Sequence, residues 1–450
     1  MASREKASAS LSAPPDASYS TPTLGRVSLN SFWLLAARVL SLGLGLLFSG
    51  LLARALGEAG LGQFAFISAL VFVGNAASTF GLDTLLQRDV AAARASAGAK
   101  SRPPLGETTS AVLLIQLAIS AAYVAILWLV APRLPNQSPA TLPALWLAAL
   151  ALIPLAFSTV YSAILRAYER MALYLGFTLV TAAIMAAGGA LLLVAGDGLT
   201  AAAGVVLAAQ TGGALAAAWL CGRSVPVRWQ WAWPSRVAVR RALRLGSALA
   251  ALMLLSVLYQ RSGLLLLSLL GGDAAAGAYS AAARVIEALK LLPGAFFGAM
   301  FPVMARAEAV GSSIDDTAQS SRRLYSRAFV GLLAASVALA ACASALAPVI
   351  VRLLFGPGYE AAASALRVMA WSLPATVVTF RLSFDLVICG RERVAATSMA
   401  LTLLVSGGLT AFLIARAGLA GAAWGLVAGE VAQVLILVTL TRLASRTESR

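Results

Sequence analysis

Long apolar stretches recur along this chain and constrain its fold more than any other feature. A helix that crosses the hydrocarbon core of a bilayer needs about 20 mostly apolar residues. The chain is 60% hydrophobic and only 12% charged, whereas a soluble domain is about a quarter charged. We therefore predict an all-α polytopic membrane protein with about twelve transmembrane helices. The predicted spans are roughly residues 30–52, 64–86, 109–131, 142–165, 172–195, 200–221, 246–270, 277–304, 328–347, 366–388, 395–415 and 420–441.

The spans fall into two sets of six, which predicts four regions along the chain. Residues 1–27 are rich in Ser, Ala, Pro and Thr and are expected to form a disordered cytoplasmic tail. Residues 28–222 form the N-lobe, with the first six helices. A basic cytoplasmic linker follows at residues 223–244. Residues 245–445 form the C-lobe, with the other six helices.

The distribution of Lys and Arg predicts how the chain is oriented in the membrane. Cytoplasmic loops collect these residues. The two tails and the even-numbered loops lie on the same side of the membrane if there are twelve spans. They hold 24 of the 34 Lys and Arg residues, and the odd-numbered loops on the other side hold five. Both termini are therefore expected in the cytoplasm.

Three short sequence matches relate the second half of the chain to the first. The segment from Gly57 to Phe64 resembles the segment from Gly272 to Tyr279. Residues 167–170 resemble residues 390–393, and residues 198–210 resemble residues 418–430, so that Gln210 corresponds to Glu430. The offsets are 215, 223 and 220 residues. Because each half has six spans, both halves begin on the same side of the membrane. This predicts two parallel repeats related by a pseudo-two-fold axis along the membrane normal, as in some transporters.

Several charged residues lie inside predicted spans, where a charge is costly and usually faces a polar interior. The acidic ones in the second half are candidate supporting or coupling carboxylates. The candidates for a cationic cavity that binds substrate are Arg38, Arg261, Arg284, Lys290 and Arg381. The candidate carboxylates are Glu287, Asp385 and Glu430.

The spacing of these charges leaves two interpretations open. Arg284, Glu287 and Lys290 are three residues apart, so they share one arc of a helix. They could form a cationic wall that binds a lipid (pyro)phosphate, or an internal cluster that ties helices together. Arg381 and Asp385 are four residues apart and can form a structural pair.

Three prolines interrupt predicted spans. A proline removes one backbone hydrogen bond and bends a helix. Pro293, Pro302 and Pro374 are therefore candidates for either static bends or hinges.

The composition argues against catalytic chemistry. The chain has no His, which removes the commonest general base and the commonest metal ligand. No spacing of Cys residues indicates a metal site. We therefore expect no enzyme activity, no catalytic residues, no metal and no cofactor. Nucleic acid is not an expected partner, since cytoplasmic loops account for the basic balance.

Three segments, in order along the chain, resemble a known family. They are residues 51–64 with Gly81-Leu82-Asp83, residues 277–302 from Gly277-Ala278-Tyr279 to Phe301-Pro302, and residues 354–366 from Leu354-Phe355-Gly356 to Leu366. The chain resembles the polysaccharide flippases, the Wzx-type exporters of the multidrug/oligosaccharidyl-lipid/polysaccharide (MOP) superfamily. The resemblance covers about residues 28–440 and implies a MATE-like fold.

The resemblance implies a function and a set of partners. The substrate would be a polyprenyl-(pyro)phosphate-linked oligosaccharide, moved across a bacterial inner membrane by alternating access for surface polysaccharide biosynthesis. Expected partners are this substrate, membrane lipids, a polysaccharide polymerase and glycosyltransferases, and the chain is expected to be a monomer. The alternative is a cation-coupled multidrug exporter of the MATE type. Many relatives have a carboxylate after a basic residue in the seventh helix. Here residues 259–263 read Tyr-Gln-Arg-Ser-Gly without one.

Overall fold

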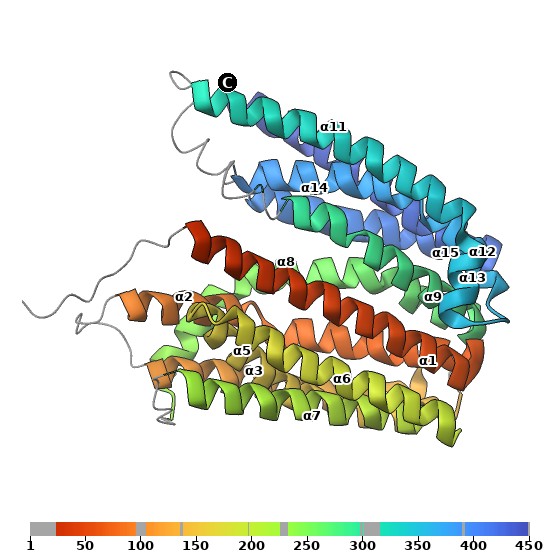
Figure 1. Cartoon of the computed structure of the whole chain (residues 1–450), viewed down its shortest axis with the longest axis horizontal. Helices are drawn as coiled ribbons and strands as arrows, with labels where there is room; N and C mark the ends of the chain where they lie inside the picture. The colour runs from red at the N-terminus through yellow and green to blue at the C-terminus, as the bar shows by residue number, and fades with distance from the viewer. Residues whose placement is uncertain are drawn as a thin grey trace, which may run out of the picture.

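The computed structural model consists of long helices that form two bundles (Figure 1). It describes residues 24–95, 105–135, 138–196, 198–225, 233–297, 300, 316–388 and 392–448, and within these residues all regular structure is helical. The N-lobe contains α1 (Leu24–Thr79), α2 (Leu82–Ala95), α3 (Leu105–Val130), the short 3-10 helix η1 (Ala131–Arg133), α4 (Thr141–Ala149), α5 (Leu152–Ala167), α6 (Met171–Ala195) and α7 (Leu199–Ser224).

The C-lobe contains the remaining helices. They are α8 (Arg236–Gly271), α9 (Asp273–Leu289), α11 (Asp316–Ala345), α12 (Ala347–Phe355), α13 (Glu360–Met369), α14 (Ser372–Ile388) and α15 (Glu392–Glu448). Helix α8 begins at Arg236, inside the segment that the sequence analysis assigns to the linker. Its first turn is capped by Ser235, whose hydroxyl accepts a hydrogen bond from Ala238 N.

The helices account for the predicted spans. Eight helices of the described chain are long and apolar enough to cross a membrane, or nine if the bent pair α13 and α14 forms one span. Two of the eight, α1 and α15, are kinked at Gly57 and Gly418. Helix α15 contains the last two predicted spans, and α1 contains the first and most of the second, which continues into α2. The span predicted at 277–304 begins with α9, which has 17 residues. The prediction of an all-α polytopic membrane protein is confirmed.

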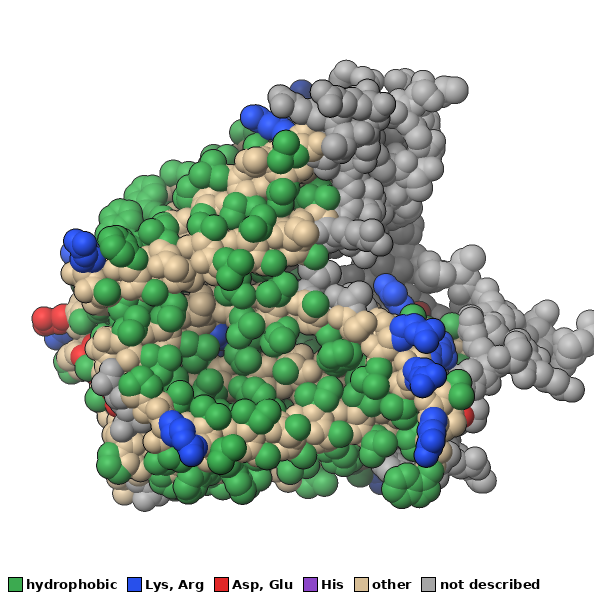
Figure 2. All heavy atoms as spheres, turned by 180° about the vertical axis from the view of Figure 1, so that it is seen from behind, with side chains coloured by type: hydrophobic (Ala, Val, Ile, Leu, Met, Phe, Trp, Pro, Cys, Tyr) green, Lys and Arg blue, Asp and Glu red, His purple; other side chains and the backbone are tan. Residues whose placement is uncertain are grey.

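Most of the visible surface is apolar, as expected of a protein in lipid. Figure 2 shows apolar side chains across this face and Lys and Arg side chains mainly near its margins. Large exposed apolar side chains include Leu191, Val194, Leu215 and Leu404. A soluble protein rarely exposes so much contiguous apolar surface, whereas lipid tails solvate it well.

One pair of repeat-related segments, beginning at Gly57 and Gly272, lies where the lobes contact each other. Gly57 and Gly272 have the same backbone conformation, with φ 70° and ψ −176° in one and φ 84° and ψ 174° in the other. Such a positive φ favours glycine. Five residues later, Gly62 packs against the carbonyl oxygen of Asp273. Gly277, which corresponds to Gly62 in the repeat, packs reciprocally against the carbonyl oxygen of Glu58, which corresponds to Asp273. A reciprocal contact of this kind is expected on a two-fold axis.

Within the described residues, the lobes share one hydrophobic core at one end, which we call the joined end and define by Gly57, Gly272 and Gly356. One large hydrophobic core spans both lobes there and includes Leu52, Phe355 and Leu366. Hydrogen bonds also cross between the lobes, from Arg54 Nη2 to Leu353 O at 2.9 Å and from Tyr359 Oη to Ala53 O at 3.0 Å. The joined end is therefore a packed interface.

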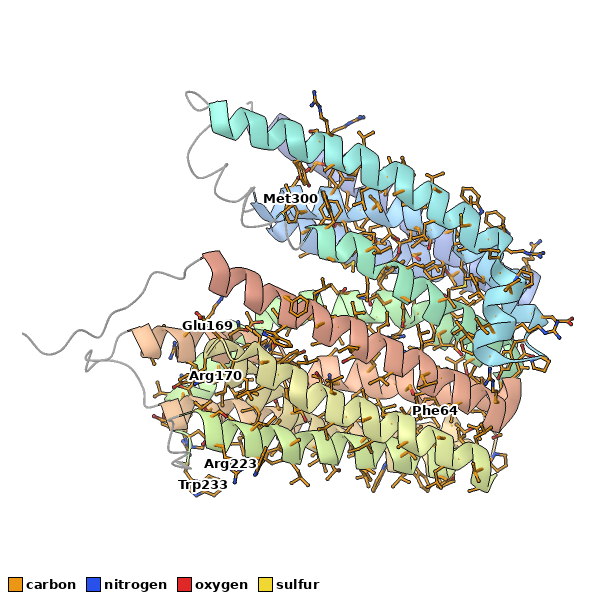
Figure 3. All side chains as sticks on the ribbon, in the orientation of Figure 1. Phe64, Glu169, Arg170, Arg223, Trp233 and Met300 are labelled. Carbon is orange, nitrogen blue, oxygen red and sulfur yellow. The ribbon has the colours of Figure 1, made fainter. Side chains whose placement is uncertain are left out.

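At the opposite end, which we call the Arg-rich end, the lobes have separate cores. Leu82, Leu86 and Leu165 belong to the core of the N-lobe, and Phe297 and Tyr325 belong to that of the C-lobe. Helices α11 and α14 diverge from the N-lobe in this direction (Figure 1). Figure 3 shows Arg170, Arg223 and Trp233 at this end and Phe64 near the other. Both ends of the described chain also lie here.

Helix α8 is the element that links the lobes at the Arg-rich end. Arg241 forms an ion pair with Asp89 at 3.1 Å, and Ser235 N donates a hydrogen bond to the Glu107 carboxylate at 2.8 Å. The other half of α8 packs against α15 of the C-lobe. A single helix thus bridges the two bundles where their cores are otherwise separate.

Candidate functional site

Three of the predicted charged residues form one cluster between α8 and α9. Arg261 Nη1 lies 2.9 Å from Glu287 Oε1, and Arg284 Nη1 lies 3.6 Å from Glu287 Oε2. One carboxylate is therefore shared by two guanidinium groups. The contact from Arg284 is longer than an ordinary hydrogen bond, so most of the five N–H donors of Arg284 remain available.

The cluster lies where the two lobes meet. The Arg261 guanidinium stacks on the Phe72 ring of α1, with its carbon 4.6 Å from the ring centre. Phe72 belongs to the N-lobe and is 42% exposed. Arg261 therefore connects the carboxylate of one lobe to an aromatic side chain of the other, and the charged group is not enclosed within a single bundle.

Lys290 has a different partner from the one that the helical spacing allows. Its Nζ atom lies 2.7 Å from Glu430 Oε1 on α15. Lys290 lies between α9, which ends at Leu289, and the helical residues 291–297. It keeps helical backbone angles, with φ −66° and ψ −13°, and its N–H donates to Ile286 O. Pro293 explains the end of α9, since it has no N–H to donate to the Leu289 carbonyl. The single arc of Arg284, Glu287 and Lys290 is thus divided between two ion pairs.

This cluster and the Lys290–Glu430 pair together carry a net positive charge. They contain three cations, Arg261, Arg284 and Lys290, and two carboxylates, Glu287 and Glu430. The side chain of Glu430 is only 6% exposed, whereas that of Arg284 is 36% exposed. The side chain of Glu287 is 37% exposed, so Arg284 and Glu287 are the most accessible of these charges, and the excess of one cation over the carboxylates suits an anion.

The seventh predicted span lacks its own carboxylate, yet a carboxylate stands beside Arg261. Glu287 of α9 provides it from the neighbouring helix. A basic residue and a carboxylate are therefore adjacent in space, although residues 259–263 contain no acidic residue. Sequence position alone could not reveal this arrangement.

Arg381 and Asp385 form the pair that their spacing allows, with 3.7 Å between Arg381 Nε and Asp385 Oδ2. Tyr325 of α11 donates a hydrogen bond to Asp385 Oδ1 at 3.3 Å. The guanidinium also lies over the Phe329 ring, 4.3 Å from its centre. Tyr325 and Phe329 could not be predicted from the sequence, because no local feature links them to residues about 60 positions later.

The remaining candidates are dispersed. Arg38 is exposed on α1, and no carboxylate of the described chain forms an ion pair with it. Pro374 lies just after the 43° bend between α13 and α14. Pro302 lies outside the described residues. In the described segments, no group of His, Cys, Asp and Glu could hold a metal ion.

Two helical bundles that are packed together at one end, with ionisable side chains between spans, define the class of protein: a two-lobed, multi-pass membrane protein. Similar folds occur among solved structures. They include an inward-facing multidrug resistance MATE family transporter of the MOP superfamily, with TM-score 0.73, 17% identity and coverage of 92% of this chain and 96% of that one. The outward-facing conformation of a MATE family transporter gives TM-score 0.61 at 17% identity, with coverage of 94% and 96%.

A flippase has a similar fold. The inward closed conformation of the lipid II flippase MurJ gives TM-score 0.69 and 14% identity, with coverage of 92% of this chain and 87% of that chain. The chain belongs to the polysaccharide biosynthesis protein family, whose model matches residues 27–308. No curated protein sequence matches it. The family membership that the sequence resemblance predicts is confirmed.

Proposed function

We propose that this protein is a flippase that moves a polyprenyl-(pyro)phosphate-linked oligosaccharide across the bacterial inner membrane. The observation that carries the proposal is the set of three cations, Arg261, Arg284 and Lys290, with only two carboxylates, in which Arg261 also stacks on Phe72 of the other lobe. A guanidinium binds the oxygens of phosphate well. The family of the chain supplies the biosynthetic context.

Transport would proceed by alternating access of the two lobes. The packed interface at the joined end and the separate cores at the Arg-rich end support a state that is open towards the Arg-rich end. The excess of Lys and Arg in the loops supports a cytoplasmic location for the Arg-rich end. In this proposal, the substrate enters there and leaves after the joined end opens.

In this proposal, the protein acts as a monomer and is not an enzyme. Its partners are the lipid-linked oligosaccharide and the surrounding lipids, together with the glycosyltransferases that assemble the substrate and the polymerase that consumes the product. The supporting roles of Glu287, Glu430 and Asp385 are to hold the cations in place. Residues 28–222 and 245–445 are the proposed moving lobes.

A cation-coupled multidrug exporter is the second candidate, because the fold is similar to that of a multidrug resistance MATE transporter. The polarity of the site argues against it. A cationic drug would meet the accessible Arg284 guanidinium and be repelled. Drug-resistance assays in cells that express the chain distinguish the two candidates, since the flippase proposal predicts no gain in resistance.

The decisive experiment reverses the charge of Arg284. Arg284→Glu should abolish export of surface polysaccharide while the protein remains in the membrane, and Arg284→Lys should retain part of the export because the charge is kept. A matched control is Arg367→Glu, an Arg on α13 far along the chain from the cluster, which should export normally. Normal export by Arg284→Glu would refute the role of the cationic cluster.

A further inference from the structure

A separate cavity lies inside the N-lobe, between α1, α5, α6 and α7. Its volume is about 340 Å³, at the lower end of the range of about 300–1,000 Å³ for small-molecule sites. Seven of the lining residues carry a hydroxyl group, Gln210 contributes an amide, and none of the lining residues is charged. The cavity therefore differs in chemistry from the cationic cluster.

Most of the hydroxyl groups in this cavity already donate their proton to their own helix. Thr159 Oγ1 donates to Leu155 O at 2.9 Å, and Thr178 Oγ1 donates to Leu175 O at 2.8 Å. Ser and Thr in helices often bond in this way. The hydroxyl oxygen still has lone pairs that can accept. The cavity wall therefore offers hydrogen-bond acceptors. It suits the hydroxyl groups of a sugar, which can donate hydrogen bonds, better than phosphate oxygens, which accept them.

Other groups in the cavity complement a sugar. The Gln210 side chain has no hydrogen-bond partner among the residues that the structure describes, so its amide can both donate and accept. Tyr174 and Phe177 meet edge to face with 5.4 Å between ring centres. Aromatic rings give an apolar surface with a negative face, against which the C–H groups of a sugar ring can pack.

The internal repeat shows how the two lobes differ. Gln210 corresponds to Glu430 at the offset of 220 residues. In the C-lobe this position holds a carboxylate that is paired with Lys290, and in the N-lobe it holds a neutral amide in an uncharged cavity. Equivalent positions thus face an ionic environment in one lobe and a neutral, hydroxyl-rich one in the other.

A cation stands at the edge of this cavity. Arg38 precedes the lining residues Ser41 and Gly45 by three and seven positions on α1, so all three residues share one helix face. At a rise of about 1.5 Å per residue, Arg38 lies about one turn nearer the start of α1 than Ser41. Its exposed guanidinium is therefore placed to meet a phosphate group that adjoins a sugar in the cavity.

We propose that the N-lobe cavity is a carbohydrate subsite that binds one sugar unit of the lipid-linked oligosaccharide, while Arg38 and the C-lobe cations bind its phosphate. This inference rests on the proposed function and assigns the two parts of the substrate to different lobes. A ligand that contacts both lobes couples their movement. Its sugar binds the N-lobe and its phosphate binds the C-lobe cations, so it stabilises the state in which both contacts are made.

Two binding probes test the assignment with the purified full chain in lipid nanodiscs. One is farnesyl pyrophosphate, and the other is the same molecule carrying N-acetylglucosamine. The cavity variant combines Thr178→Val and Gln210→Leu, which remove polar atoms with little change in volume, and each substitution is also made singly in case the double variant fails to fold. The control is Thr211→Val, whose exposed hydroxyl makes the same kind of bond, to Leu207 O at 2.8 Å.

The native protein should bind the sugar-bearing probe about tenfold more tightly than the sugar-free probe, as expected for a few net hydrogen bonds. The cavity variants should lose this preference and bind the sugar-free probe as the native protein does, and Thr211→Val should retain it. Equal binding of both probes by the native protein, or an unchanged preference in the cavity variants, would overturn the subsite and leave the proposed function standing. Failure of the native protein to bind either probe would overturn both.

Discussion

Replacement of Glu430 by Gln removes the carboxylate that neutralises Lys290, and its effect on stability can be worked out from the structure. The two charged atoms are 2.7 Å apart. At an effective dielectric constant of about 20, their attraction is about 6 kcal/mol. Transfer of both groups from water costs several kcal/mol per ion and offsets much of this gain. The pair itself is therefore expected to contribute little net stability.

The single substitution should nevertheless be costly, because it leaves an ammonium group without a partner. Breaking a buried ion pair costs about 3–5 kcal/mol. The Lys290 side chain is 24% exposed, and this partial exposure places the expected loss near the lower value, about 3 kcal/mol. The double variant Glu430→Gln with Lys290→Met removes both charges and should recover most of the loss, because well-packed apolar replacements are often neutral.

The assay is equilibrium unfolding of the purified chain in mixed micelles as the fraction of SDS is raised, followed by Trp fluorescence. Lys290→Met leaves Glu430 unpaired and should also cost about 3 kcal/mol, while the double variant should lose only about 1 kcal/mol, so a double-mutant cycle should give a coupling free energy of about 5 kcal/mol. Glu360→Gln is the control, since this exposed residue on α13 forms no ion pair within the described chain, and it should change the stability by less than about 1 kcal/mol. If the double variant is as unstable as Glu430→Gln, the pairing of Lys290 with Glu430 is wrong.

Two further predictions concern the contacts between the lobes. Gly62→Ala should destabilise the chain by about 1–3 kcal/mol in the same unfolding assay, because the added methyl group would press against the backbone of α9. The control is Gly43→Ala, which has open space around it and should be neutral or stabilising. Equal effects of the two substitutions would contradict the close approach of the lobes. The hydrogen bonds from Ser235 lower the pKa of Glu107, so the attachment of α8 is complete above the ordinary Glu pKa of about 4.3 and is lost as the pH falls through the lowered value. Hydrogen exchange of the first turn of α8, corrected for its intrinsic rate, should therefore accelerate in the native chain as the pH is lowered from about 6 to about 3. In Glu107→Gln the corrected rate should change little. The same acceleration in both proteins would show that Glu107 is not the group that titrates.

Much of the fold follows from local features of the sequence. A span is recognised from about 20 consecutive apolar residues, and tight turns are marked by glycines such as Gly57 and Gly272, whose positive φ the structure contains. The repeat was visible for the same reason, since it preserves short local motifs. Helix ends were less predictable. Helix α8 extends to Arg236 because its first turns pack against the N-lobe, which no local pattern shows.

The charged residues and their approximate depth could likewise be read from the sequence, but their partners could not. Spacing put Lys290 beside Glu287, whereas the structure pairs it with Glu430, 140 residues away. The cavity of the N-lobe could not be predicted from the sequence, because isolated Ser and Thr residues on three helices, with Gln210 on a fourth, have no common local signal. Apolar length and charge are properties of a single segment, so the sequence by itself determined the spans and their charge asymmetry. Ion pairing and cavity shape depend on distances between helices, and only tertiary packing sets those distances.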